Sequence, residues 1–315
     1  MQNKPMRTMI LTGRNLILAL VLAAFGATAA HAGKHDRLAN THPALWTVHG
    51  RQGTAYLFGS LHVLPPTVKW KTKPLLAAMR KSDIFVFEIP LDRSVEDREE
   101  AQRIQKSIMD VHGLLPPGQS LRGLLSPNHQ ADYDVALARL SISPGYIDRL
   151  QPWLASMVLE TAQLRHADES TMTGVDVQVY AIATSMNKQS QGLETFEQQL
   201  AMVTPEEQKA GLDELDASVN EAIHGGQDQK YRAMVEAWSR GDLRTLDSIA
   251  VKGLSSDPAM KKVLLDDRNA RWTMQIESML EEPHTYFITV GAAHLVGSAG
   301  LPSLLREAGY RVDGP

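Results

Sequence analysis

Two segments near opposite ends of the chain repeat one order of elements, and this repeat constrains the fold most strongly. Each segment contains an apolar strand-like run, a G-x-x-H motif, a helical stretch and a second strand-like run. In the first segment these lie at residues 54–58, 59–62, 74–81 and 84–89. In the second they lie at residues 285–290, 291–294, 302–308 and 310–312. Runs that are apolar on both faces are typical of internal strands, so the two units are expected to pair in one sheet.

The rest of the chain is mostly helical. A strand at residues 45–49 precedes the first unit, and Gly50 to Gly53 predict a hairpin turn between them. Helical patterns follow from about residue 94 to 176, with proline breaks, and a short strand is predicted at 189–193. Further helices are predicted at 152–165, 176–186, from Pro205 onward, at 228–240 and at 266–280. The expected fold is α/β, with a central mixed sheet from the two strand–G-x-x-H–helix–strand units and a large helical insertion between them.

His62 and His294 end the two G-x-x-H motifs, each directly after a buried strand. In open α/β sheets, ligands bind beyond the carboxyl ends of the strands. Gly59 and Gly291 allow a tight turn or the close approach of a ligand. A lone histidine is more often structural, but the shared context of this pair predicts that both side chains enter one crevice.

Glu88 interrupts the apolar run at residues 84–89. A carboxylate buried there costs several kcal/mol unless a cation, a metal ion or hydrogen-bond donors satisfy it. If its strand neighbours the one before His62, Glu88 lies close to that histidine. The alternative is a structural salt bridge to an arginine.

His62, His294 and Glu88 together predict a site for a divalent metal ion. Such a site lowers the pKa of a bound water and polarises a carbonyl group. Glu88 is either a ligand or the general base, and the sequence does not separate these roles. Arg268 and Asn269, near the start of the helix at 266–280, are candidates to hold an anion and to form hydrogen bonds in the site. From the residues alone, helix capping and surface charge, shared with Asp267, is the favoured interpretation.

Other polar residues and one loop remain open candidates. Glu194 and Glu197 follow the predicted strand at 189–193, and Asp176 is expected to cap a helix. The apolar loop at residues 63–70 either lines a substrate groove or covers the core.

The N-terminus resembles a secretory signal peptide. Lys4, Arg7 and Arg14 precede an apolar run at residues 16–27, and Ala30-His-Ala32 matches an A-x-A cleavage site. The run is shorter than the ~20 residues that a membrane span needs; an uncleaved anchor is the alternative. We therefore expect residues 1–32 to be removed, residues 33–315 to form a single domain, and the protein to be exported, most simply to the periplasm, with no membrane span after cleavage.

Composition narrows the chemistry. The chain has no cysteine, so thiolate metal ligands, cysteine nucleophiles and disulfides are excluded. The formal net charge of -4 gives no basic footprint for nucleic acid, which is therefore not expected as a partner. Histidine and carboxylate remain as the strong metal ligands.

Several short motifs occur in the order typical of one protein family. They are Phe58-Gly-Ser-Leu-His62, Phe87-Glu88, Gly192-Leu-Glu194, Ala237-Trp-Ser-Arg-Gly-Asp242, Arg268-Asn269 and Val290-Gly-Ala-Ala-His294. From about residue 45 to 312 the chain resembles the TraB/GumN family, which includes Tiki proteins and looks related to erythromycin esterase and ChaN-like folds. The resemblance implies a site of His62, Glu88 and His294, with Arg268 and Asn269 next. It also implies metal-dependent peptide cleavage, with Mn²⁺ or Co²⁺ favoured and Zn²⁺ possible.

The function expected from the sequence is an exported metal-dependent hydrolase, most simply a peptidase, acting on a peptide or small molecule of the cell envelope. Two other classes remain open. One is an envelope protein that binds a metal ion or haem without catalysis. The other is an esterase that uses a histidine as base and needs no metal ion.

Overall fold

The computed structural model describes residues 41–90, 103, 113–167, 174–195, 198–199, 205–225, 227–251 and 258–315. The predicted signal segment, residues 1–32, lies outside the described residues, as do most of residues 91–112. Within the described part, no helix is long and apolar enough to cross a membrane.

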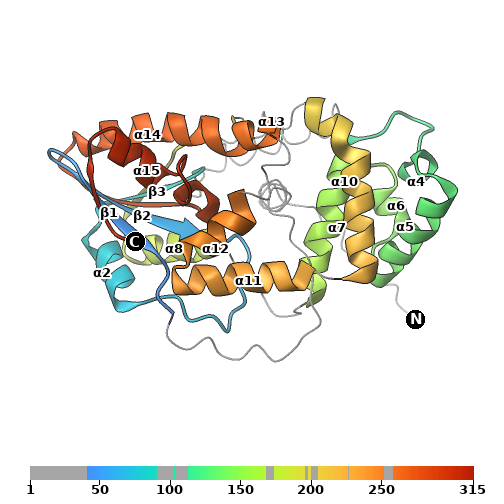
Figure 1. Ribbon diagram of the computed structural model, residues 1–315, viewed down its shortest axis with the longest axis horizontal. Coiled ribbons are helices and arrows are strands. Elements are labelled where there is room, and N and C mark those ends of the chain that lie inside the picture. Colours follow the sequence, from blue (N-terminus) through green and yellow to red (C-terminus); the bar gives the residue numbers. More distant parts are fainter. Residues whose placement is uncertain are drawn as a thin grey trace, which may run out of the picture.

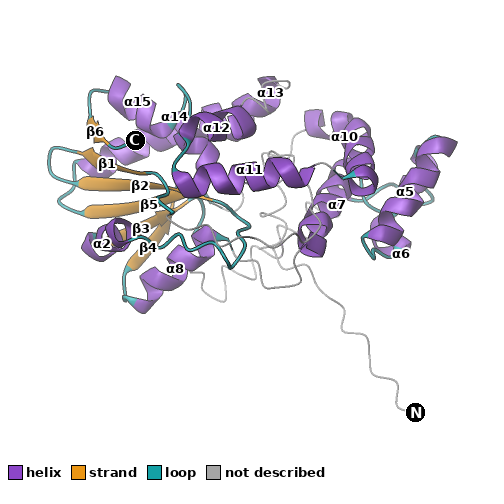
Figure 2. Ribbon diagram, turned by 60° about the horizontal axis from the view of Figure 1, so that its bottom comes forward, coloured by secondary structure: helices purple, strands orange, loops and turns teal. Residues whose placement is uncertain are grey.

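Six strands form one mixed sheet in the order β4-β3-β5-β2-β1-β6 (Figures 1 and 2). The strands are β1 (Leu45–His49), β2 (Thr54–Ser60), β3 (Ile84–Phe87), β4 (Gln189–Gly192), β5 (Thr285–Gly291) and β6 (Arg311–Asp313). Strands β2, β5, β3 and β4 run parallel, and β1 is antiparallel to both β2 and β6. The predicted α/β fold with a central mixed sheet is confirmed.

The first strands of the two repeated units are direct neighbours. β2 and β5 pair in parallel from Thr54↔Thr285 to Ser60↔Gly291, as the repeat predicts. β5 pairs with β3 on its other side, so the strand before Glu88 does not neighbour the strand before His62. β5 pairs with β2 over seven residues and with β3 over four, so the second repeated unit places its strand between the two strands of the first unit.

Helices cover both faces of the sheet. On one face α14 (Asp267–Leu280) and α15 (Leu301–Glu307) pack on Leu57, Val86 and Ile288. On the other face α2 (Lys73–Lys81), α8 (Val175–Ser185) and α11 (Gln227–Arg240) pack on the strand phenylalanines Phe58, Phe85 and Phe287. Alternate strand residues thus enter opposite cores, as the two-residue period of a strand requires.

Part of the insertion between the two units forms a separate group of helices beyond one end of the sheet, on the right of Figure 1. This group contains α4 (Leu121–Leu124), α5 (Pro127–Arg139), α6 (Pro144–Ile147), α7 (Pro152–Ala167) and α10 (Pro205–His224). The elements α8, β4, α11 and α14 come from the same insertion but belong to the sheet side. Serines at the starts of α4 and α5 accept hydrogen bonds from backbone N–H groups, and Pro127 occupies the first turn of α5. The group has a buried cluster of its own, which includes Leu159 and Leu215.

Short elements connect the larger ones near the strand ends. They are α12 (Leu243–Leu246), the π-helical turns η2 (Asp247–Val251) and η4 (Lys262–Asp266), α13 (Pro258–Lys261) and the 3-10 turn η5 (Ala292–Leu295). The strand predicted at 84–89 ends at Phe87, so Glu88 is the first residue after the strand instead of lying within it.

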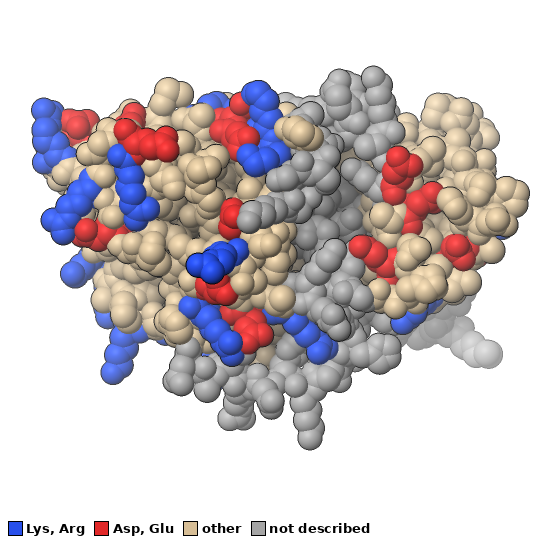
Figure 3. Space-filling view, viewed as in Figure 1, with Lys and Arg blue, Asp and Glu red and all other residues tan. Residues whose placement is uncertain are grey.

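On the face shown in Figure 3, charged side chains of both signs are intermixed over the sheet side, on the left, whereas acidic side chains predominate over the helical group on the right. Several are paired, as Arg122 is with Asp134 and Arg240 with Glu236.

Candidate functional site

The parallel strands β2, β3 and β5 bring His62, Glu88 and His294 together at their carboxyl ends. His62 follows β2, Glu88 follows β3, and His294 lies in η5 directly after β5. The Nε2 atom of His294 is 3.9 Å from Oε1 of Glu88. The three residues singled out by the sequence therefore come together at the carboxyl ends of neighbouring strands.

Gly291 lies at the centre of this group. Its backbone N–H donates a 2.6 Å hydrogen bond to Oε1 of Glu88. A Cβ atom at this position would lie 3.2 Å from Oε1 of Glu88 and 3.8 Å from Nε2 of His62. A glycine is needed here because a side chain would push against the Glu88 carboxylate.

Glu88 is buried beside a buried arginine. Its Oε2 accepts a 2.6 Å hydrogen bond from Nη2 of Arg268, on α14. Burial by itself would raise the pKa of the Glu88 carboxyl, but the nearby positive charge, chiefly that of Arg268, lowers that pKa to about 2. Glu88 is therefore ionised. The salt bridge to an arginine, which was the alternative interpretation of Glu88, is present.

Arg268 uses all five of its N–H donors within the protein. Besides Glu88, its guanidinium donates two hydrogen bonds to Glu194, one to the carbonyl of Leu264 and one, at 3.1 Å, to Nε2 of His294. Its Cζ atom also lies 4.5 Å from the centre of the Trp272 ring. Arg268 thus holds two carboxylates and one imidazole in place and has no donor left for a substrate.

His294 has both ring nitrogens engaged. Its Nε2 accepts from Arg268, which is always a donor, so the proton lies on Nδ1, which donates to Oδ1 of Asn269 at 2.6 Å. Asn269 in turn donates to the carbonyl of Ala299 at 2.7 Å. Burial, followed by the charge of Arg268, lowers the pKa of His294 to about 3. His294 is therefore a neutral imidazole in a fixed orientation.

His62 is held differently. Its Nδ1 lies 3.7 Å from Oδ2 of Asp176, in the first turn of α8. Its Nε2 is buried and has no hydrogen-bond partner within the described residues. Burial would lower the pKa of His62, but the negative charges of Asp176 and then Glu88 raise it overall. The contact with Asp176 favours the proton on Nδ1 and leaves the lone pair on Nε2.

The start of α8 is fixed to the loop that carries His62. The backbone N–H of Val175 donates to the carbonyl of Leu61 at 2.9 Å, and Gly174 has no room for a Cβ atom against the carbonyl of His62. The sequence predicts Asp176 only as a helix cap and does not predict its position beside His62. The Gly-x-Asp spacing at a helix start was the signal present.

The remaining candidates have four different outcomes. Glu194 joins the site through Arg268, whereas Asp267 forms a salt bridge with Lys262. Glu197 lies outside the described residues. In the loop at 63–70 the apolar residues Val63, Leu64, Val68 and Trp70 are buried in the core, so the loop covers the core.

The donor set has the chemistry of a metal site but not its arrangement. The buried, unpartnered Nε2 of His62 is a suitable ligand atom. However, the guanidinium of Arg268 binds both Glu88 and His294, where a metal ion would need their lone pairs. Across the described residues, no three His, Asp or Glu side chains are placed to hold an ion together. The side chains as placed therefore do not fit the three-ligand metal centre expected from the sequence.

Comparisons with known proteins agree with the motifs. The chain is 25% identical over 252 residues to the uncharacterized protein YbaP of Shigella flexneri. This alignment covers 80% of the chain and 88% of the relative. The chain is also 25% identical over 251 residues to YbaP of Escherichia coli (strain K12), covering 80% and 87%. No solved structure matches the chain. The model of the TraB/PrgY/gumN family matches residues 44–314. Since this match includes both G-x-x-H units and the insertion between them, the chain belongs to the TraB/PrgY/gumN family.

Proposed function

We propose that the protein is a hydrolase in which His62 activates a water molecule to attack an acyl carbonyl, with a peptide as the leading substrate and an ester as the alternative. The observation that carries the proposal is the buried, unpartnered Nε2 of His62, whose Nδ1 faces Asp176. A carboxylate that orients a histidine, and a free nitrogen on the other side of the ring, are the features of a general base.

The proton is conserved in the proposed step. The water oxygen bonds to the carbonyl carbon while its proton passes to Nε2 of His62. The imidazolium that forms lies between the carboxylates of Asp176 and Glu88, which both raise the pKa of His62. The same proton then passes to the departing nitrogen or oxygen as its bond to the carbonyl carbon breaks.

His294, Asn269 and Arg268 act as positioning residues in this scheme. Their hydrogen bonds are already made within the protein. They therefore hold the Glu88 carboxylate in place beside Gly291, close to His62. A rigid, water-poor site of this kind strengthens the electrostatic effects of its charges.

Metal-dependent hydrolysis, the leading expectation from the sequence, predicts a different arrangement, in which Arg268 no longer binds Glu88 and His294. The placement of Arg268 favours the form that uses histidine as base. The effect of a chelator on the rate of hydrolysis distinguishes the metal-dependent enzyme from the enzyme that uses histidine as base. Retention of haem with an intense visible absorption band and no turnover would instead support the binding protein.

The N-terminal pattern supports an envelope location for this hydrolase. Cell fractionation of a C-terminally tagged protein, combined with mass measurement of its N-terminus, tests export and cleavage after Ala32. We expect the periplasmic fraction to hold a chain that begins at Gly33.

The function is tested by screening the purified protein against peptide and ester libraries, with and without a chelator. We expect hydrolysis that survives chelation, and a loss of about 100-fold or more in His62→Ala. His224→Ala, at the exposed end of α10, is the matched control and is expected to keep full activity. Full activity in His62→Ala would overturn the proposal, and chelator-sensitive activity restored by Mn²⁺ or Co²⁺ would establish the metal-dependent form.

Asp176→Asn tests the positioning role by a pH profile. Since His62 must be neutral to accept a proton, activity is expected to rise as the pH increases through its raised pKa. Removal of the Asp176 charge lowers that pKa, so the rising limb should move to lower pH while the maximal rate falls. An unchanged limb would mean that Asp176 does not act on His62.

A further inference from the structure

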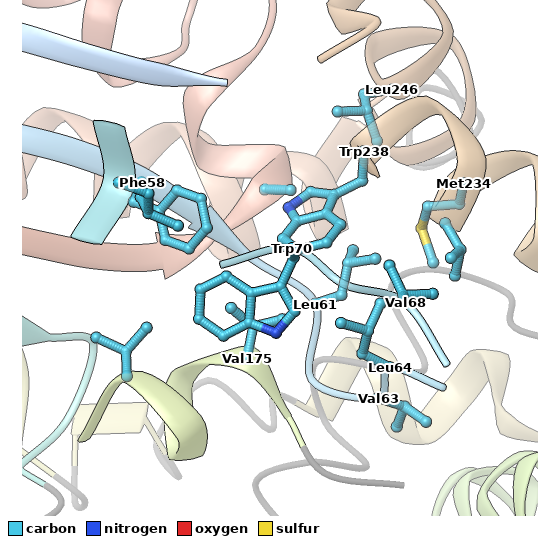
Figure 4. Close-up of a cluster of buried hydrophobic side chains, with 14 of the residues drawn as sticks. Phe58, Leu61, Val63, Leu64, Val68, Trp70, Val175, Met234, Trp238 and Leu246 are labelled. Atoms are coloured by element: carbon cyan, nitrogen blue, oxygen red, sulfur yellow. The ribbon is translucent and has the colours of Figure 1, made fainter. Parts of the chain in front are cut away.

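A small pocket lies beside His62, on the side of the sheet covered by α11. Its volume of about 20 Å³ is enough for one water molecule, which needs roughly 10–15 Å³, and is too small for an acyl group of a substrate. Figure 4 shows four of the apolar side chains around it, those of Leu61, Val63, Met234 and Leu246. The complete apolar wall consists of Leu61, Val63, Met234, Leu246, Ala250 and Ala292.

Two other lining residues carry a buried polar atom that has no hydrogen-bond partner among the described residues. They are Ser60, through its Oγ, and His62, through its Nε2. Ser60 is the last residue of β2 and is 2% exposed. The hydroxyl of Tyr231, which also lines the pocket, donates to the carbonyl of Val63 at 3.1 Å. Since an unpaired polar atom inside a protein is costly and a buried water needs two to four polar partners, one water would satisfy both atoms.

We propose that this pocket holds the water molecule that His62 activates, and that the hydroxyl of Ser60 fixes this water and is a second catalytic residue. The proposal rests on the proposed function, because it takes His62 as the general base. It adds the place where the attacking water is held and the group that holds it, neither of which the base itself specifies.

Each bond and lone pair of the water has one role in this step. One O–H group donates to Nε2 of His62 and transfers its proton there. The hydroxyl of Ser60 donates to one lone pair of the water oxygen, and the other lone pair bonds to the carbonyl carbon. The second O–H group stays on that oxygen and becomes part of the acid product, so Ser60 neither gains nor loses a proton.

The size of the pocket distinguishes this role of Ser60 from that of a nucleophile. Ser60, His62 and Asp176 have the residue types of a Ser-His-Asp triad. In a triad, however, Oγ of Ser60 would have to bond to the carbonyl carbon, and a pocket of about 20 Å³ does not admit the acyl group. A water extends the reach of the two side chains by one hydrogen bond, about 2.8 Å. The carbonyl carbon then reacts without entering the pocket.

High-resolution crystallography of the mature protein is the first test and needs no turnover. We expect one ordered water within about 2.5–3.2 Å of both Oγ of Ser60 and Nε2 of His62. Ala250→Val adds two methyl groups to the pocket wall and should exclude this water while the rest of the site is unchanged. The absence of a water at these two atoms, or a direct hydrogen bond from Ser60 to His62, would overturn the proposal.

The rate of hydrolysis is the second test. Ser60→Ala should lower kcat by about 10- to 100-fold because the water is no longer held in place, and should leave KM nearly unchanged because the substrate does not touch Ser60. Thr289→Val is the matched control and should keep full activity. It also removes a buried hydroxyl that has no partner among the described residues, but Thr289 pairs with Phe58 on β2 and lies outside the pocket lining.

A double variant tests whether the two changes act through the same water. Ser60→Ala combined with Ala250→Val should be no slower than the slower of the two single variants, because the water can be lost only once. Losses that multiply in the double variant would overturn the proposal. So would a covalent acyl group on Ser60, detected by intact mass after acid quenching, because it would make Ser60 the nucleophile.

The two tests separate failure of the pocket from failure of the function. An ordered water at Ser60 and His62 without any His62-dependent hydrolysis would remove the hydrolase, and with it the catalytic role of this water. Hydrolysis that depends on His62 but is unchanged in both Ser60→Ala and Ala250→Val would leave the hydrolase and remove the role of the pocket.

Discussion

At the scale of single residues, Arg268 is the buried cation that connects Glu88, Glu194 and His294. It is 2% exposed and is paired with two carboxylates that are also buried, those of Glu88 and Glu194. Burial would lower its pKa, but these carboxylates raise it overall. A buried ion pair contributes little net stability when intact, yet removal of one partner is costly because the other charge stays buried.

Replacement of Arg268 by methionine should therefore lower the free energy of unfolding by about 3–5 kcal/mol, measured by urea denaturation at neutral pH. Arg271 offers a matched control, since it also approaches Glu194, at 3.4 Å, but its side chain is 49% exposed. Arg271→Met should change stability by no more than about 0.5 kcal/mol. Equal losses in the two variants would show that the buried network is not what Arg268 stabilises.

Glu88 should make stability depend on pH in the acid range. Its pKa is about 2 in the folded chain against an ordinary value of 4.5, so the unfolded chain binds more protons between these values. The stabilisation is therefore complete above pH 4.5 and is lost as the pH falls toward 2. In Glu88→Gln the slope of unfolding free energy against pH should be smaller by roughly one proton in this window. Urea midpoints measured from pH 2 to 6 give both slopes, and identical slopes would contradict the assignment of a paired carboxylate.

At the scale of elements, the contact between α8 and the loop that carries His62 sets the orientation of this proposed general base. A Cβ atom on Gly174 would lie 2.3 Å from Oδ1 of Asp176 and 2.8 Å from the carbonyl of His62. Gly174→Ala should move α8 away from the loop and cost about 1–3 kcal/mol of stability.

Activity should fall further in this variant than the loss of stability explains, because the Asp176–His62 contact lengthens. Gly145→Ala provides the control: its nearest neighbour would be Ser143 Oγ at 3.9 Å, so it should be neutral or slightly stabilising. Calorimetry and a hydrolysis assay on both variants test this, and a fully active, stable Gly174→Ala would show that α8 does not set the position of His62.

The elements were largely predictable from sequence, but most of their contacts were not. Apolar runs, prolines and caps predicted the strands and the helices α2 and α8, because these signals are local, and the internal repeat predicted that its two units lie in one sheet. The position of β5 between β2 and β3 depends on contacts between segments far apart in the sequence, which no local signal determines. Residues 62 and 176, like 88 and 268, are far apart in the sequence, and no local signal fixes a contact between them. The sequence therefore identified His62, Glu88, His294, Arg268 and Asn269, while the structure alone showed how they are connected.

At the scale of the whole molecule, the helical group and the sheet have separate hydrophobic cores. The cluster of α4, α5, α6, α7 and α10 shares no buried residue with the clusters on the two faces of the sheet. All described residues of the site belong to the sheet side, on or next to β2, β3, β5, α8 and α14. The helices α4, α5, α6, α7 and α10 therefore supply none of the groups described in the site.

This separation predicts that the helical group opens without the sheet. Leu215 of α10 is fully buried within the helical cluster, and Leu215→Ala should cost about 2–5 kcal/mol there. In hydrogen exchange measured by mass spectrometry, amides of α5, α7 and α10 should exchange faster while those of β2 and β5 keep their protection. Leu57→Ala, an equal truncation in the sheet core, should have the opposite pattern. A uniform rise in exchange over both parts in Leu215→Ala would mean that the two cores unfold as one cooperative unit.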